Sequence, residues 1–229
     1  MFSEMNPKSL DHVALWVADR DPIADFVTRH LGMHVIDRTD TFTLVGSHAR
    51  HGKLTLFAAE GPRDLGALEH IALRVNDLRE ALGRLPEGLA LDQPRPGEAY
   101  FDVAEGLRLG LVEAETDVEY DLDHVSLRSA DPESALEGWV ELGLNPYGDD
   151  RVEVGGAFVE VRPGGAGEEP ERPLLNHLAV LVDSAAEAEG AGFEVESVVD
   201  AANTFAVFVW GPERVRLEYV EHKPSFSLT

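Results

Sequence analysis

A short motif occurs four times along the chain, and it constrains the fold more than any other feature of the sequence. Each copy reads leucine, polar residue, histidine, aliphatic residue, small residue, aliphatic residue, and the copies begin at Leu10, Leu68, Leu122 and Leu175. The histidines lie 58, 54 and 53 residues apart and are His12, His70, His124 and His177. Self-similarity at such a period indicates one supersecondary unit that is used four times.

Each copy of the motif is predicted to form a β-strand, because its polar and apolar residues alternate with a period of two. In the third copy, Val125 and Leu127 face one side of the strand, whereas His124, Ser126 and Arg128 face the other. One face of the sheet is therefore expected to carry the histidines, and the other face the aliphatic core.

The residues after each motif repeat as well. An acidic residue suits a helix N-cap, and helices are predicted over residues 22–31, 78–85, 132–142 and 184–191. A glycine closes each helical stretch, as expected where the chain turns left-handed. Three shorter β-like runs then follow, and in the fourth copy they span residues 193–199, 204–210 and 215–221. The repeated unit is thus predicted to be βαβββ.

The predicted fold class is α+β, with four βαβββ modules paired into two domains. Each domain is expected to be an incomplete barrel of mixed β-sheet with its helices outside. The charged segment 113–121 is the predicted boundary, so that residues 1–115 hold one pair of modules and residues 120–229 hold the other. Residues 163–173 combine glycine, proline and acid, and we expect them to form an exposed loop.

Composition limits the chemistry and the partners of this chain. Its 229 residues include 43 acidic and 19 basic ones, and the net charge of −24 argues against binding nucleic acid or anionic membranes. It has no cysteine, which excludes disulfides, thiolate nucleophiles and cysteine-ligated metals. No apolar run suggests a signal peptide or a membrane span. We therefore expect a cytoplasmic protein that acts on a small molecule, and a homo-oligomer remains open.

The last strand of each module decides where a metal ion is expected. Aligning the four last strands places Phe57, Gly110, Glu160 and Glu218 at one position. The C-terminal half therefore combines two histidines with carboxylates, and two histidines with one carboxylate suit iron(II) and leave coordination positions open. The N-terminal half has only His12 and His70, and we expect it to be metal-free, with both histidines as relics of the repeat.

The fourfold βαβββ repeat, with a histidine strand opening each module and a glutamate strand closing the last ones, resembles the vicinal oxygen chelate superfamily. That superfamily includes glyoxalase I, bleomycin-resistance proteins and type I extradiol dioxygenases, and two paired domains per chain most resemble the dioxygenases. The resemblance implies a metal-free N-terminal domain and a C-terminal site in which His124, His177 and Glu218 bind iron(II), with Mn(II), Zn(II) or Ni(II) as other candidates. The segment from Trp210 to Tyr219 resembles the closing stretch around the carboxylate ligand. Glu160 is either a fourth ligand, as the glyoxalase pattern implies, or a polar residue on an edge strand.

The leading functional hypothesis is an iron(II)-dependent extradiol-type dioxygenase, acting on a catechol-like or other vicinally oxygenated small molecule as in aromatic catabolism. The alternatives are a glyoxalase- or epimerase-like isomerase or lyase, in which Glu160 or Glu218 moves a proton, and a non-catalytic binding protein of the bleomycin-resistance kind. Extradiol enzymes carry a further histidine and tyrosine before the glutamate, but residues 200–209 contain neither, and Phe208 stands where the tyrosine is expected. The candidates for handling protons are then His222, Tyr219 and Asn203. Arg128 is a candidate anchor for an anionic substrate or an ordinary arginine at a strand end.

Overall fold

The computed structural model describes residues 5–164 and 170–229. Residues 165–169 of the predicted loop lie outside the described part of the chain. The structure contains four modules in chain order, each opened by the strand that carries the histidine motif. These modules build two mixed sheets that do not close into barrels, which confirms the predicted α+β fold class.

The first half of the chain forms two modules. The first consists of β1 (Ser9–Val17), α1 (Asp21–His30), β2 (His34–Arg38), β3 (Phe42–Gly46) and β4 (Lys53–Ala58). The second consists of β5 (Leu68–Val75), α2 (Leu78–Gly83), β6 (Glu98–Asp102) and β7 (Arg108–Glu113). The second module lacks one of its three expected closing strands. Residues 86–96 contain three prolines, which cannot donate a hydrogen bond to a sheet, and only an isolated bridge from Asp92 to Tyr100 forms there.

The second half forms two further modules. The third consists of β8 (Asp121–Ser129), α3 (Pro132–Glu141), β9 (Asn145–Tyr147), β10 (Arg151–Val154) and β11 (Ala157–Pro163). The fourth consists of β12 (Leu175–Leu181), α4 (Glu187–Gly190), β13 (Val195–Asp200), β14 (Thr204–Trp210), a 3-10 turn (Pro212–Arg214) and β15 (Arg216–His222). The predicted helices and strands of the fourth module agree with the structure to within about three residues at each boundary.

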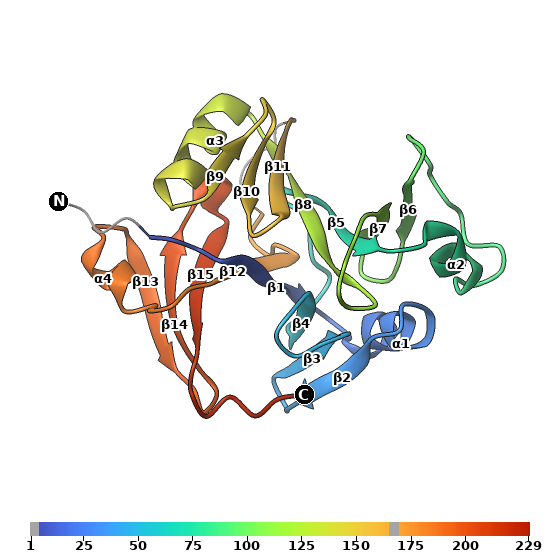
Figure 1. Ribbon diagram of the computed structural model, residues 1–229, viewed down its shortest axis with the longest axis horizontal. Helices are drawn as coiled ribbons and strands as arrows, with labels where there is room; N and C mark the ends of the chain where they lie inside the picture. The colour runs from blue at the N-terminus through green and yellow to red at the C-terminus, as the bar shows by residue number, and fades with distance from the viewer. Residues whose placement is uncertain (1–4, 165–169) are drawn as a thin grey trace.

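The sheets pair the modules in a way that the sequence analysis did not expect. The eight-stranded sheet runs β13-β14-β15-β12-β1-β4-β3-β2, and the seven-stranded sheet runs β6-β7-β5-β8-β11-β10-β9. The first module therefore shares a sheet with the fourth, and the second with the third, as the blue with red and green with yellow strands show (Figure 1). The expected pairing of first with second and third with fourth is wrong for these sheets. Four similar opening strands can pair in several combinations, and only packing across the whole chain selects among them.

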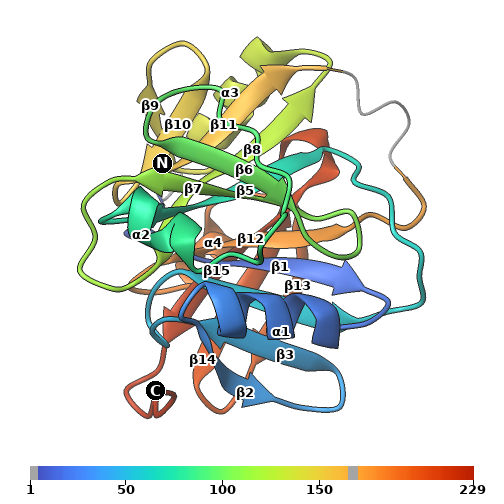
Figure 2. The same ribbon diagram turned by 90° about the vertical axis from the view of Figure 1, so that its right-hand side faces the viewer.

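The apolar faces of the strands and helices pack into one continuous core. Helix α1, for example, buries Ile23, Ala24 and Val27 and contacts β2 and β3 of its own module (Figure 2). In β1 the core face carries Val13, Leu15 and Val17, so the opposite face remains for the histidine, as predicted. No helix in the described part of the chain is long and apolar enough to cross a membrane.

Candidate metal centre

The small residue of the repeated motif makes room for a histidine from the neighbouring strand. Strands β1 and β12 pair antiparallel, with His12 opposite Ala179 and His177 opposite Ala14. The same arrangement joins the other two copies, where the opposed pairs are His70 with Ser126 and His124 with Ala72. A small side chain at each of these positions lets the opposing imidazole lie over the strand, so two histidines meet on one face of each sheet.

The polar residue before each histidine sits in an irregularity of the strand pairing. The register shifts between Leu10 and His12, which leaves Asp11 as an extra residue in β1, and a matching shift leaves Asn176 as an extra residue in β12. Such a bulge re-aims the side chains around it. Asp11 and Asn176 can therefore reach the ring of the histidine that follows, although ordinary alternation would place them on the other face.

Three side chains converge at the join between the first and fourth modules, and we call them the His12 cluster: His12, His177 and Glu218. The Nε2 atoms of His12 and His177 are 3.1 Å apart, and the Glu218 Oε2 atom lies 3.2 Å and 2.8 Å from them, respectively. In an octahedral site with bonds of about 2.1 Å, neighbouring ligand atoms are about 3.0 Å apart. The cluster thus has the spacing of three ligands on one face of an octahedron, which is the facial triad of two histidines and one carboxylate.

Hydrogen bonds at the other ring nitrogens orient both imidazoles. His12 Nδ1 donates to Asp11 Oδ1 at 2.8 Å, and His177 Nδ1 donates to Asn176 Oδ1 at 2.9 Å. The Asn176 oxygen also accepts from Arg216, which identifies it as the acceptor in both contacts. Both Nε2 atoms therefore point at the Glu218 carboxylate, so that a proton or a metal ion can bind among the three atoms. Partners of this kind fix the tautomer of metal-binding histidines.

The electrostatics of the cluster place a proton where a metal ion would bind. Burial by itself lowers the pKa of His12, but Glu218 and Asp11 raise it to about 9. Burial raises the pKa of Glu218, yet His12 and His177 lower it to about 2. Burial lowers the pKa of His177, against the opposing effect of Glu218. At neutral pH the metal-free cluster thus holds one proton on His12 and a charged Glu218.

Buried Lys53 completes the support of His12 and was not singled out in the sequence. Its Nζ atom lies 2.8 Å from Asp11 Oδ1 and donates to the Ala49 carbonyl oxygen at 2.8 Å. Burial acts to raise the pKa of Asp11, but Lys53 and His12 lower it well below its usual value. The recurring polar residue before each histidine was the sequence signal for Asp11 and Asn176. Lys53 carries no comparable signal, because it reaches Asp11 from β4.

The structure does not bring all of the predicted ligand residues together. It brings His177 and Glu218 together, as predicted, but their partner is His12 and not His124. That His12 is a relic of the repeat stays a prediction, although the structure places His12 beside His177 and Glu218. The reason is the sheet pairing: β12 is hydrogen-bonded to β1, whereas β8, which carries His124, is hydrogen-bonded to β5.

A second group of similar composition lies in the other sheet, and we call it the His70 cluster: His70, His124 and Glu160. The Nε2 atoms of its histidines are 2.9 Å apart. Here, however, the Glu160 carboxylate accepts from Arg162 Nε at 2.8 Å and from Arg151 at 3.3 Å. Two guanidinium groups thus supply the positive charge that a metal ion would otherwise bring, and the fit to a metal is poor.

The His70 cluster also differs in its protonation and its fourth position. Burial, followed by the neighbouring His124, lowers the pKa of His70 to about 3, so that His70 stays neutral. The position that corresponds to a further ligand is Gly110, and the Tyr100 ring occupies the space beside it. Glu160 is thus neither a fourth ligand of the His177 site nor on an edge strand, because β11 lies between β8 and β10.

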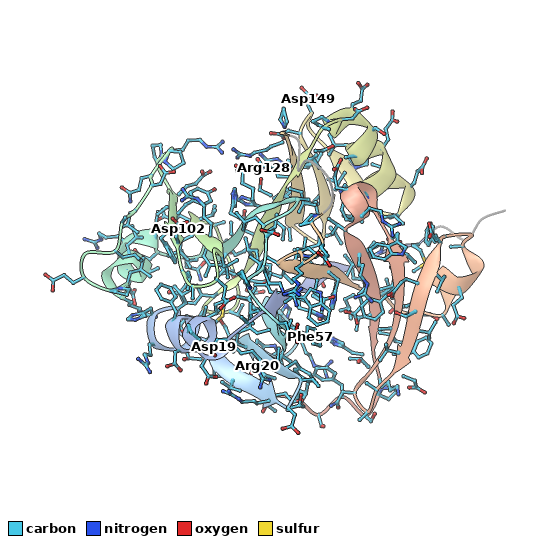
Figure 3. All side chains as sticks on the ribbon, turned by 180° about the vertical axis from the view of Figure 1, so that it is seen from behind. Asp19, Arg20, Phe57, Asp102, Arg128 and Asp149 are labelled. Carbon is cyan, nitrogen blue, oxygen red and sulfur yellow. The ribbon has the colours of Figure 1, made fainter. Side chains whose placement is uncertain are left out.

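Strand register also corrects the position assigned to Phe57. Glu218 is opposite Ala179, and the equivalent residue in the first module, opposite Ala14, is Thr55. Phe57 lies two residues further along β4, with its ring 6.2 Å from that of His177 between centroids. Figure 3 shows Phe57 between the strands of the first module and those of the fourth. The alignment from sequence was out by two residues because β4 and β15 share little beyond alternation.

The His12 cluster opens into a cavity of about 580 Å³, a size typical of small-molecule sites. Two of the three candidates for handling protons, His222 and Asn203, line this cavity. His222 Nε2 lies 3.0 Å from Asp11 Oδ2, and Asn203 Oδ1 accepts from the Ser227 backbone. Tyr219 is buried in the core and donates its hydroxyl proton to the Leu142 carbonyl oxygen, so the structure does not place it in the site.

Comparisons with known proteins agree with this architecture. Residues 9–107 match the model of the Glyoxalase/Bleomycin resistance protein/Dioxygenase superfamily. The match covers less than half of the chain, and it shows that this part of the chain resembles the superfamily. The resemblance to the vicinal oxygen chelate proteins is thereby confirmed, whereas the closer resemblance to extradiol dioxygenases stays a prediction. Among curated proteins, no sequence matches this chain.

Solved structures of similar fold cover nearly the whole chain. A Bacillus subtilis protein described as a "putative dioxygenase" has a TM-score of 0.78 at 18% identity, covering 97% of this chain and 87% of its own. Glyoxalase I from Zea mays has a TM-score of 0.73 at 17% identity, covering 93% and 92%. The cppA protein from Streptococcus pneumoniae has a TM-score of 0.62 at 15% identity, covering 95% and 99%. At these identities the likeness shows the fold alone.

Proposed function

We propose that the chain is a metal-dependent dioxygenase of the extradiol type, with one divalent ion, iron(II) as the leading candidate, held by His12, His177 and Glu218. The observation that carries the proposal is the facial spacing of 2.8–3.2 Å among these three donor atoms at the floor of a cavity. A facial triad leaves three neighbouring coordination positions for ligands that are not protein. A vicinal diol needs two of them and dioxygen needs one.

Bound iron(II) would acidify and orient the two substrate oxygens and provide a position for dioxygen. Both atoms of dioxygen enter the ring-opened product in an extradiol cleavage, so no external reductant is required. The protein's own contribution begins with orientation: Asp11 and Asn176 hold the two imidazoles with their Nε2 atoms toward the ligand site. The rings of Phe57 and Phe208 lie beside His177 and exclude water from one side of the site.

One proton must leave the substrate when a diol binds through both oxygens. His222 lines the cavity, and its ring is stacked on Phe226 with centroids 4.3 Å apart. We assign His222 as the residue that accepts this proton, while Asp11 is already engaged by Lys53 and His12. Of the three residues that the sequence offered for handling protons, His222 thus receives this role, and Tyr219 is excluded because it lies in the core.

An isomerase or lyase of the glyoxalase kind is the second candidate, because that fold and that ligand chemistry belong to the same superfamily. Such a reaction needs a carboxylate that moves a proton next to the metal. Glu160 belongs to the His70 cluster, and only Glu218 remains at the site. The loss of one of the two proposed bases favours the dioxygenase over the isomerase.

Metal analysis and oxygen consumption test the proposal together. Protein loaded anaerobically with iron(II) is expected to hold one ion per chain and to consume one dioxygen per molecule of 4-methylcatechol cleaved. If iron binds in the expected ratio but no catechol of a panel causes oxygen uptake, the dioxygenase assignment is wrong. Turnover of an α-hydroxyketone or hemithioacetal panel with Zn(II) or Ni(II) would then favour the isomerase.

The two clusters provide matched control variants. His12→Ala and Glu218→Gln are expected to abolish metal binding and activity. His70→Ala and Glu160→Gln make the same chemical changes in the other sheet and are expected to retain both. Circular dichroism of each variant checks that the fold persists. If the His70 cluster variants lose the metal while the His12 cluster variants keep it, the assignment of the site is wrong.

A further inference from the structure

Apolar and aromatic side chains form much of the wall of the cavity above the His12 cluster. The apolar side chains that line it include Phe42, Leu44, Phe57, Phe208, Val220 and Phe226. The rings of Phe42 and Phe57 are 5.8 Å apart between centroids and form an aromatic side of the cavity, and Trp16 supports Phe57 from behind with its ring at 5.4 Å. Such a surface favours ligands that bury apolar area.

Apart from His12, which is paired with Asp11 and Glu218, the same cavity offers no cation that is available to a ligand. Among the described residues that line it, Lys53 is the single lysine and there is no arginine. Lys53 is 3% exposed and is held by Asp11 and by the Ala49 carbonyl oxygen. The carboxylates of Asp37 and Glu218 also line the cavity, so its fixed charge is acidic before a metal ion binds.

Arginines near the site are engaged elsewhere. Arg216 donates to Asn176 and Glu196, and Arg50 lies over the Phe226 ring at 4.4 Å; neither lines the cavity. Arg128, the residue considered from sequence as an anion anchor, pairs with Glu69 on the other sheet. Figure 3 shows Arg128 well away from Phe57, so it cannot serve this cavity.

We propose that this site selects vicinal diols whose substituents are neutral and apolar, and that it rejects diols that carry a carboxylate or another anionic group. The inference rests on the proposed function for the diol, and on the lining of the cavity for the charge preference. An anionic substituent would lose its hydration without gaining a cationic partner, which is strongly unfavourable. The net charge of −24 adds a long-range repulsion that slows the approach of anions.

Two catechols that differ in one group test the charge preference directly. 4-Methylcatechol and 3,4-dihydroxybenzoate place a methyl group or a carboxylate at the same ring position. With Zn(II)-loaded protein, which binds the diol without oxidising it, we expect 4-methylcatechol to bind about 100-fold more tightly, since a buried carboxylate has no partner. Equal affinities, or tighter binding of the carboxylate, would overturn the inference and leave the proposed metal site intact.

A second pair separates failure of this inference from failure of the proposed function. p-Cresol and 4-hydroxybenzoate lack a vicinal diol and are titrated into metal-free protein, and the change in tryptophan fluorescence is followed, since Trp16 lies beside Phe57. A preference for p-cresol supports the selection against anionic groups even if no metal ion binds to His12. Equal affinities within this pair contradict the inference, as they do within the first pair, whatever the metal analysis shows.

A gain of function completes the test. Thr41 is exposed and lines the cavity. Thr41→Arg adds a cation there and is expected to raise the affinity for 3,4-dihydroxybenzoate about fivefold or more, as one ion pair allows. Thr41→Gln, of similar length and without charge, is expected to have no such effect. Equal responses of the two variants would mean that charge does not determine the selectivity.

Discussion

Metal binding at the His12 cluster should release one proton, and its affinity should depend on pH in a defined way. In the metal-free protein, His12 carries a proton between Glu218 and Asp11 because these carboxylates raise its pKa to about 9. A metal ion needs the Nε2 lone pair that this proton occupies. His177, whose pKa is lowered, and Glu218, with a pKa of about 2, already have their ligand atoms free at neutral pH.

The magnitude follows from the pKa of His12 alone. At pH 7 a group with a pKa of about 9 is about 99% protonated, so each metal ion displaces about one proton. The dissociation constant is then about 50-fold weaker at pH 7 than at pH 9; it improves about ninefold from pH 7 to 8 and about fivefold from pH 8 to 9, where half of His12 is still protonated. A free histidine with a pKa near 6.5 would give almost no dependence over this range.

Calorimetric titration with Zn(II) at pH 7, in buffers of different ionisation enthalpy, counts the released protons. Competition with a chelator between pH 6.5 and 9 measures the slope of affinity against pH. His124→Ala should leave both results unchanged, whereas His12→Ala should lose the binding. Release of less than about 0.3 proton per bound ion at pH 7 would refute the reasoning, because His12 would then not be the protonated ligand.

Four further outcomes follow from the geometry of the two clusters. Asp11→Asn should weaken metal binding about 10- to 100-fold in chelator competition, because it weakens the hydrogen bond that orients the His12 ring. The matched control, Asp123→Asn beside His124, should leave metal binding unchanged. Elemental analysis should find one ion per chain both in the native protein and after Glu160→Gln; two ions in the native protein would contradict the role given to Arg162. Tyr219→Phe should lower the free energy of unfolding in urea by about 1–3 kcal/mol, since it leaves a buried carbonyl unpaired, without a change in KM or kcat. His222→Gln should lower kcat at unchanged metal affinity, and equal kcat values would remove His222 from the mechanism.

The fold was predictable because its information is local and repeated. Alternation and the closing glycines identified the strands and helices to within a few residues in the fourth module, whereas the predicted acidic N-cap is present only in the second and third modules, at Asp77 and Asp131. The second module departed from the pattern where prolines removed hydrogen-bond donors from residues 86–96. These features depend on neighbours along the chain, and such neighbours are visible in a sequence.

The site was predictable only in part. His177 and Glu218 lie on strands of one module, and their proximity follows from that module's own parallel pairing. Their third partner lies 165 residues from His177 and depends on which opening strands pair. The role of Lys53 cannot be predicted from the sequence for the same reason, because Lys53 reaches Asp11 from another strand.

The sequence by itself determined four equivalent strands, each with a histidine, a polar residue before it and a small residue after it. The motif thereby determined that, when two such strands pair, each imidazole lies over a small side chain of the other strand and is oriented by the residue before it. Only the tertiary structure decided that β1 pairs with β12 and β5 with β8, and hence that Glu218 faces His12 while Glu160 meets two arginines. The physical reason is that strands of like pattern pair almost equally well locally, so the choice between them is made by packing over the whole chain.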